Sequence, residues 1–286
     1  MDWVREGACL PPAEPGDADA LRAWRPWVVE ETDSLRMWYS GHDGTTWRIL
    51  HATGRLDGTW TRQGVVIEPG LAGETDDYGV QAPCVVRTRG GLLMAYAGFD
   101  GEVNRLHMAS SMDGASWTPL GTFLHRGEDD NLGASQPSLL ITGLRWWLFF
   151  AGYGGPEDAR QSSIVAAVSE NGASWDRIGA VMGPSEGELS VANPCVIEHE
   201  LEFEMFYASD DGERTGIALA TSRDGVNWDR RGVVLPPSGD GDDGLETQTP
   251  CVVRLSDGTF RMWYSGLPID DTQHGYRICT ARLESR

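Results

Sequence analysis

The sequence predicts an all-β protein, a five-bladed β-propeller, because two markers return along the chain in phase. A Trp recurs at steps of 57, 57, 58 and 53 residues, and a Pro that opens an apolar run recurs with it. Self-similarity at one period indicates a repeat architecture before any local propensity is considered. The markers are Trp3, Trp60, Trp117, Trp175 and Trp228, with Pro26, Pro83, Pro137, Pro194 and Pro250.

Each unit contains the pattern of four short antiparallel strands. The Pro opens a first apolar run, such as residues 195–197, and a more hydrophobic second run follows, such as MWYSG at 37–41. A third, alternating run at 217–220 leads through the hairpin SxDGxxW at 222–228 into a fourth strand. Asp-Gly between two apolar alternations is a strong hairpin signal, because Gly adopts positive φ without steric conflict.

The two ends of the sequence indicate how the ring closes. The last unit stops after its third strand, near residues 279–283, whereas residues 3–10 resemble a fourth strand without a unit of its own. Pairing the two would remove an exposed sheet edge, which is an aggregation liability. A β-sandwich is the alternative, but it does not explain the constant period. We expect one domain, 1–286, with blades at about 26–60, 83–117, 137–175, 194–228 and 250–284, and residues 1–12 completing the last blade.

Composition limits the partners and the compartment. A formal net charge of −20 disfavours nucleic acid and anionic membranes as partners. No run approaches the length of a membrane span, and no leader pattern opens the chain. Three of the five cysteines occupy one slot in different units, so we expect free thiols in a reducing, cytoplasmic setting and a small-molecule substrate. These three are Cys84, Cys195 and Cys251.

Residues that break the internal symmetry near the axis are the candidates for substrate binding. The first strand of a propeller blade lines the central channel, and the loops that lead into it open on one face. Binding sites form where such loops converge on a rigid frame. The predicted substrate-binding residues are Trp24, Arg25, Gln81, Gln136, Asn193, Gln248, Arg105 and His274.

The predicted catalytic residues are carboxylates on the same face. Glu246 is the only carboxylate four positions before a marker Pro, and Asp210 and Asp77 are its possible partners. Glycoside chemistry uses two carboxyl groups about 5–10 Å apart across the scissile bond. Other acids recur in every entering loop, and this recurrence favours a solvated acidic rim. They are Asp19, Asp76, Asp130, Glu188, Asp242 and Asp243.

No cofactor or metal is expected, although a divalent cation in the acidic mouth is an alternative. The six His have no paired spacing of the zinc type. The chain also lacks a Gly-x-Ser-x-Gly elbow and a Gly-rich phosphate loop with Lys.

The Pro-led strand, the MWYSG-type second strand and the SxDGxxW hairpin together resemble the five-bladed propeller glycoside hydrolases, families 43, 62, 32, 68 and 130. The resemblance covers essentially the whole chain and implies carbohydrate chemistry. In family 43, catalytic Asp residues typically stand as Asp-Pro at the start of a first strand. No carboxylate occupies that position here, so those catalytic residues are not matched. The residues before the Pro are Arg25, Ala82, Gln136, Asn193 and Thr249.

Three functions are open from the sequence. A carbohydrate-active enzyme would use the loop carboxylates on a small glycoside, with amides binding hydroxyls and Trp24 stacking on a sugar face. A repurposed intracellular biosynthetic enzyme, of cyclase or lyase type, would use Arg25 to bind a substrate carboxylate or phosphate. A non-catalytic carbohydrate-binding propeller would repeat near-identical sites, which the divergence of the channel residues disfavours.

Overall fold

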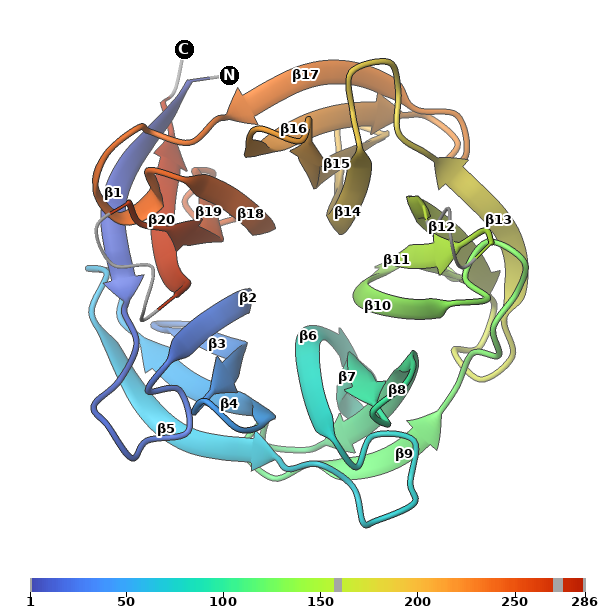
Figure 1. Cartoon of the computed structure of the whole chain (residues 1–286), viewed down its shortest axis with the longest axis horizontal. Coiled ribbons are helices and arrows are strands. Elements are labelled where there is room, and N and C mark those ends of the chain that lie inside the picture. Colours follow the sequence, from blue (N-terminus) through green and yellow to red (C-terminus); the bar gives the residue numbers. More distant parts are fainter. Residues whose placement is uncertain (1, 157–160, 270–274, 285–286) are drawn as a thin grey trace.

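The computed structural model describes residues 2–156, 161–269 and 275–284, and these are organised almost entirely as β-strands. Figure 1 shows the strands arranged around a central axis, with β2, β6, β10, β14 and β18 innermost. Within the described residues, no helix is both long enough and apolar enough to cross a membrane.

Consecutive strands pair antiparallel in groups. The first two groups are β2 (Arg22–Glu30), β3 (Leu35–His42), β4 (Trp47–Gly54) and β5 (Trp60–Ile67), then β6 (Gly79–Thr88), β7 (Gly91–Phe99), β8 (Asn104–Ser111) and β9 (Thr118–Thr122). The next two are β10 (Gly133–Thr142), β11 (Arg145–Gly154), β12 (Gln161–Ser169) and β13 (Asp176–Met182), then β14 (Ser190–His199), β15 (Glu202–Asp210), β16 (Thr215–Ser222) and β17 (Asp229–Leu235). The short 3-10 helix η2 (Gly241–Asp243) precedes β18 (Glu246–Arg254), β19 (Phe260–Leu267) and β20 (Arg277–Leu283).

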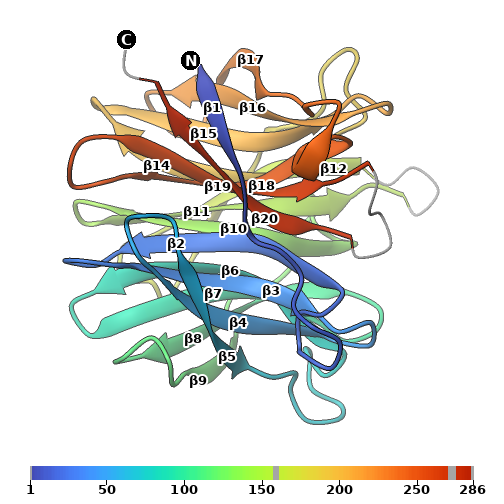
Figure 2. The same ribbon diagram turned by 90° about the vertical axis from the view of Figure 1, so that its left-hand side faces the viewer.

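The amino-terminal strand β1 (Trp3–Leu10) pairs antiparallel with β20, from Trp3 opposite Leu283 to Leu10 opposite Ile278. Figures 1 and 2 show the two ends of the described chain side by side. Single parallel bridges, Trp47 to Gly79 and Thr215 to Glu246, join neighbouring groups. The hydrogen-bonded sheets therefore contain eight, four and eight strands, and none of them encircles the axis.

Each innermost strand carries a β-bulge at its Pro. The register shifts there, for example between Gln81 and Cys84 of β6, so the strand continues across a residue that has no N–H to donate. The residue before each Pro is left-handed, with φ of 52–58°. This backbone is uncommon without Gly, and the bulge re-aims the side chain toward the axis. The sequence pattern predicts that these residues lie in the loops entering the innermost strands; this is wrong, because β2 begins at Arg22 and β6 at Gly79.

A ring of hydrogen bonds links the innermost strands. The side chain one position after each Pro bonds the backbone of the next innermost strand, at 2.8–3.3 Å. These bonds connect β2 to β6, β6 to β10, β10 to β14, β14 to β18 and β18 to β2, so they encircle the axis. The side chains are Trp27, Cys84, Ser138, Cys195 and Cys251. The expectation of free thiols is confirmed for the described cysteines, and three of them also accept backbone hydrogen bonds.

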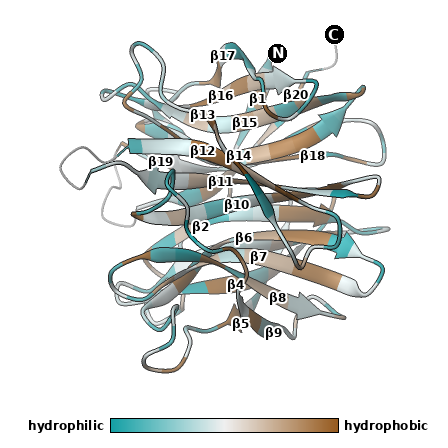
Figure 3. Cartoon of the chain, turned by 90° about the vertical axis from the view of Figure 1, so that its right-hand side faces the viewer, coloured by the Kyte–Doolittle hydropathy of each residue, from teal (hydrophilic) through white to brown (hydrophobic). Residues whose placement is uncertain are grey.

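The hydrophobic core lies between adjacent strand groups rather than at the axis. One cluster joins Phe149 and Ile164 to Met205 and Tyr207 of the next group, all buried. Figure 3 shows brown hydrophobic stretches within the strands. The recurring hairpin Trp also belongs to the scaffold, since Trp228 Nε1 donates to the Gly225 carbonyl at 3.1 Å.

The recurring acids of the entering loops are ion-pair partners inside this scaffold, so the interpretation of a solvated acidic rim is wrong for most of them. Asp19 is 1% exposed and accepts from Arg62 Nε at 2.8 Å and from the Tyr39 hydroxyl at 2.9 Å. The same arrangement of a loop acid with an Arg of an outer strand recurs around the ring. These pairs are Asp130 with Arg177, Glu188 with Arg230, and Asp243 with Arg5.

Candidate functional site

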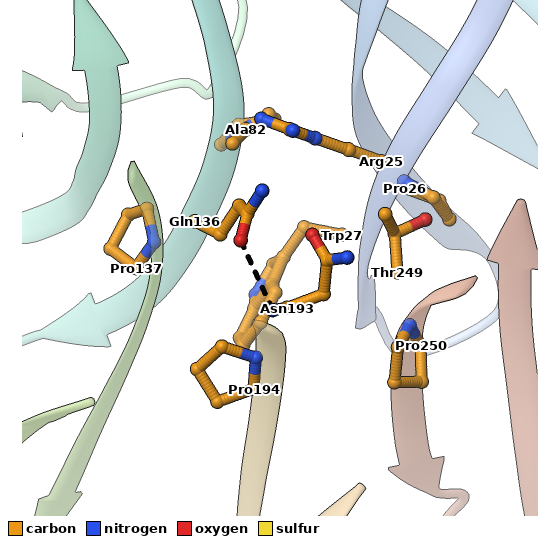
Figure 4. Close-up of a pocket in the computed structure, with 11 residues that line it drawn as sticks. Arg25, Pro26, Trp27, Ala82, Gln136, Pro137, Asn193, Pro194, Thr249 and Pro250 are labelled. Atoms are coloured by element: carbon orange, nitrogen blue, oxygen red, sulfur yellow. Dashed lines mark hydrogen bonds between the residues drawn. The ribbon is translucent and has the colours of Figure 1, made fainter. Parts of the chain in front are cut away.

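Two connected spaces lie at the axis. The residues before the Pro line a narrow channel, which Figure 4 shows with the side chains of Arg25, Gln136, Asn193 and Thr249. Arg25, Gln136 and Asn193 also line a wider cavity of about 520 Å³. Seven of the residues predicted from the sequence converge on this cavity. They are Trp24, Arg25, Gln136, Asn193, Asp210, Glu246 and Gln248.

Three predicted residues lie elsewhere. Asp77 Oδ2 accepts from the Gly73 N–H at 2.7 Å, in the loop before β6. Gln81 Nε2 donates to Asn104 Oδ1 at 3.3 Å, and Arg105 pairs with Asp100. None of these three lines the 520 Å³ cavity as far as the described residues define it. His274 lies outside the described residues.

A chain of amides crosses the cavity wall. Asn193 Nδ2 donates to Gln248 Oε1 at 3.3 Å, and the Asn193 N–H donates to Gln136 Oε1 at 3.1 Å, the contact dashed in Figure 4. Gln136 Nε2 then donates to the Tyr153 hydroxyl at 3.3 Å. Asn193 Oδ1 is buried and accepts none of the hydrogen bonds among the described residues. An amide oxygen can accept two hydrogen bonds, so Asn193 is a buried polar group whose acceptor capacity the described residues do not use.

Glu246 is held at the start of β18 by two donors. The Tyr276 hydroxyl and Gln248 Nε2 both donate to Glu246 Oε2, the second at 2.9 Å. Burial, together with the hydrogen bond to Glu246, raises the pKa of Tyr276, so its hydroxyl keeps its proton and acts as a donor. Oε1 of Glu246 accepts no hydrogen bond from the described residues, which leaves this oxygen for a ligand.

Strand register sets the separation of the two cavity carboxylates. Asp210 and Glu246 both stand opposite Thr215, on β15 and β18 at either side of β16. Adjacent strands lie about 4.8 Å apart, so two spacings put the Cα atoms about 10 Å from each other. Both residues also line the same cavity, so the register brings the two positions to one wall of it.

Aromatic rings form another part of the wall. Trp24 stacks on Tyr276 with ring centroids 5.2 Å apart and an interplanar angle of 11°. The Arg25 guanidinium carbon lies 3.9 Å from the Trp24 ring centroid. Trp24 Nε1 is buried and has no hydrogen-bond partner among the described residues. Stacking of Trp24 on a sugar stays a prediction, since the ring already contacts a guanidinium and a phenol.

Several lining residues are not predicted by the sequence pattern. Three of them are Tyr153 near the end of β11, Thr215 at the start of β16, and Tyr276 directly before β20. They occupy no slot that a marker Pro defines, so the repeat alignment gave no signal for them. Within the described ranges, no group of three or more His, Cys, Asp or Glu is placed to hold a metal ion.

Sequence comparison finds relatives of this chain but no family. No family model matches the chain. Two uncharacterized proteins of Mycobacterium tuberculosis, from strains CDC 1551 / Oshkosh and ATCC 25618 / H37Rv, are each 27% identical over 93% of this chain and 90% of their own length.

Solved structures are more informative about architecture. A glycoside hydrolase superposes with a TM-score of 0.82 at 16% identity, over 99% of this chain and 92% of its own. A thermostable family-43 glycoside hydrolase gives 0.69 at 14% identity, over 92% and 90% of the two chains. A GH130 structure, from work on glycoside hydrolases that target beta-1,2 mannosidic linkages in Candida mannan, gives 0.74 at 15%, over 99% and 95%. The chain thus has the β-propeller fold of these glycoside hydrolases.

Proposed function

We propose that this protein is a carbohydrate-active enzyme that cleaves a small glycoside in the axial cavity, with Glu246 and Asp210 as the carboxylate pair. We further propose that the frame is one domain of five blades, closed by the pairing of β1 with β20. The ring of hydrogen bonds around the innermost strands supports this architecture.

The observation that carries the proposal is the convergence of Glu246 and Asp210 on one cavity, opposite the same residue, Thr215. Glycoside cleavage needs one carboxyl group to protonate the leaving oxygen and a second to act as base or nucleophile, about 5–10 Å away. Two interstrand spacings separate the two Cα atoms by about 10 Å, a backbone separation from which the two carboxyl groups can come within that range. Asp77, the other predicted partner, is bound to a loop N–H away from the cavity lining.

The amide wall supports a sugar over an apolar substrate. Gln136, Asn193 and Gln248 supply donors and acceptors, and the Trp24–Tyr276 pair supplies apolar ring surface. Binding sites for small polar molecules combine such surfaces with a few convergent polar groups. The five-fold divergence of these residues supports one central site over a site repeated in each blade.

The proposal is tested by turnover of a panel of aryl glycosides, with and without inorganic phosphate, by the wild type and carboxamide variants. For the substrate that the wild type cleaves, we expect Glu246→Gln and Asp210→Asn each to lower kcat/KM by a factor of about 10²–10⁴, the contribution of one acid or base. Asp77→Asn serves as the matched control and is expected to retain wild-type turnover. Full activity of Glu246→Gln would refute the assignment.

A further inference from the structure

Arg25 is a buried cation without an anionic partner among the described residues. The residue is 9% exposed, and its Nη1 donates one long hydrogen bond, to Ser135 Oγ at 3.3 Å. Its Nε is buried and has no hydrogen-bond partner. Burial of a charged group is unfavourable unless the charge is paired and its donors are satisfied. The guanidinium therefore has donor capacity that the protein itself does not use.

Two other arginines of the fold have a buried carboxylate as their partner. Arg62 pairs with Asp19 at 2.8 Å, and Arg177 pairs with Asp130 at 2.9 Å, with both acids 1% exposed. The chain holds 43 Asp and Glu against 23 Arg, so carboxylates are abundant. The arginine that lines the axial channel and the cavity is nevertheless left without one.

The position of Arg25 is fixed before any ligand arrives. Its N–H donates to Ser265 Oγ at 3.0 Å, and the bulge holds its φ at 52°. The guanidinium lies over the Trp24 ring, 3.9 Å from the centroid, which suits a cation–π contact. Burial lowers the pKa of Arg25 to about 10, so the group is still charged at neutral pH. A fixed charge binds a ligand with little loss of side-chain freedom.

We propose that Arg25 binds an oxyanion, a carboxylate or a phosphate, carried by the saccharide in the cavity. This inference rests on the proposed function and adds the substrate class, an acidic sugar in place of a neutral one. The planar guanidinium fork matches the geometry of both oxyanions. Glu246 lines the same cavity but is not in an ion pair with Arg25; its Oε2 accepts from Tyr276 and Gln248.

Binding is measured by titration calorimetry with D-glucuronate, D-galacturonate and D-mannuronate, each beside its neutral hexose, and with the hexose 6-phosphates and inorganic phosphate. We expect at least one anion to bind the wild type about tenfold or more tightly than its neutral counterpart, as a charge-assisted hydrogen bond provides. Preference for the uronates would identify a carboxylate, and preference for the 6-phosphates or phosphate alone would identify a phosphate. In Arg25→Gln this preference should disappear.

Arg55→Gln is the matched control, because Arg55 is an exposed arginine paired with Asp57. It should keep the wild-type preference. Arg25→Lys keeps the charge without the planar fork, so we expect it to keep part of the preference for the anion over its neutral counterpart. If circular dichroism shows that Arg25→Gln does not fold, Arg25→Lys replaces it as the test variant. The inference is overturned if no anion outcompetes its neutral counterpart in the wild type, or if the preference survives in Arg25→Gln.

The two proposals fail in different ways. Turnover of a neutral glycoside that depends on Glu246, with no effect of Arg25→Gln, would overturn the anion inference and leave the enzymatic proposal standing. Anion binding that depends on Arg25, without turnover of any glycoside, neutral or acidic, would support the anion inference and count against the enzymatic proposal.

Discussion

Asp19→Asn tests the interpretation that the buried loop acids hold the scaffold together. Asp19 is 1% exposed and accepts from Arg62 and Tyr39, so the substitution leaves a guanidinium without its counter-ion. Breaking a buried pair by removing one partner costs about 3–5 kcal/mol. The Arg62 side chain is 32% exposed and keeps part of its hydration. We therefore expect a loss near the lower limit, about 3 kcal/mol, in the free energy of unfolding.

The assay is urea unfolding followed by tryptophan fluorescence, with Glu68→Gln as the control. Glu68 pairs with Arg48 at 2.8 Å, but its side chain is 63% exposed, and exposed pairs contribute about 0–1 kcal/mol. Anion binding in the axial cavity should be unchanged in Asp19→Asn, because Asp19 is not among the residues lining it. If Asp19→Asn loses no more stability than Glu68→Gln, the reasoning that the buried acids hold the scaffold together fails.

Two further predictions concern buried polar groups. Burial and the nearby Arg36 charge lower the pKa of His51 to about 4, below its ordinary value of 6.5, so the unfolded chain takes up this proton first as the pH falls. Stability contributed by neutral His51 is then lost between about pH 6.5 and pH 4, and His51→Phe should flatten that part of the stability profile measured by urea unfolding. Ser138→Ala should cost about 1–3 kcal/mol in unfolding free energy, since the buried Val196 N–H loses its acceptor, whereas Ser138→Cys should lose much less. Equal losses in the two Ser138 variants would contradict a role for the ring of hydrogen bonds.

The fold was predictable from the sequence because each repeat contains the same pattern of apolar strand residues and turn residues. The MWYSG run at residues 37–41 lies within β3, Leu35–His42, as expected for a buried second strand. The apolar runs predict strands that begin at the marker Pro, whereas the innermost strands begin four residues earlier, as at Arg22 of β2 and Gly79 of β6. A β-bulge allows the strand pairing to continue on both sides of the Pro. The bulge places the residue before the Pro in the left-handed region, which the local sequence does not predict.

The site was only partly predictable, because some of its residues are placed by the repeat and others by contacts between distant strands. Residues in the slots beside the Pro, such as Gln136 and Asn193, reach the axis because every innermost strand bends in the same way. Asp210 and Glu246 come together through cross-strand register at Thr215, which is a tertiary property. Burial of the loop acids is not predictable from the local sequence, because their Arg partners lie 42–47 positions away or at the opposite end of the chain.

The central claim is that one asymmetric cavity at the axis binds the substrate between Glu246 and Asp210. The most direct measurement is a crystal structure of Glu246→Gln with the glycoside that the wild type cleaves. We predict a single sugar in the axial cavity, within hydrogen-bond distance of residue 246 and the amides of Asn193 and Gln248. A sugar bound on the outer faces of the strand groups, with none at the axis, would contradict it.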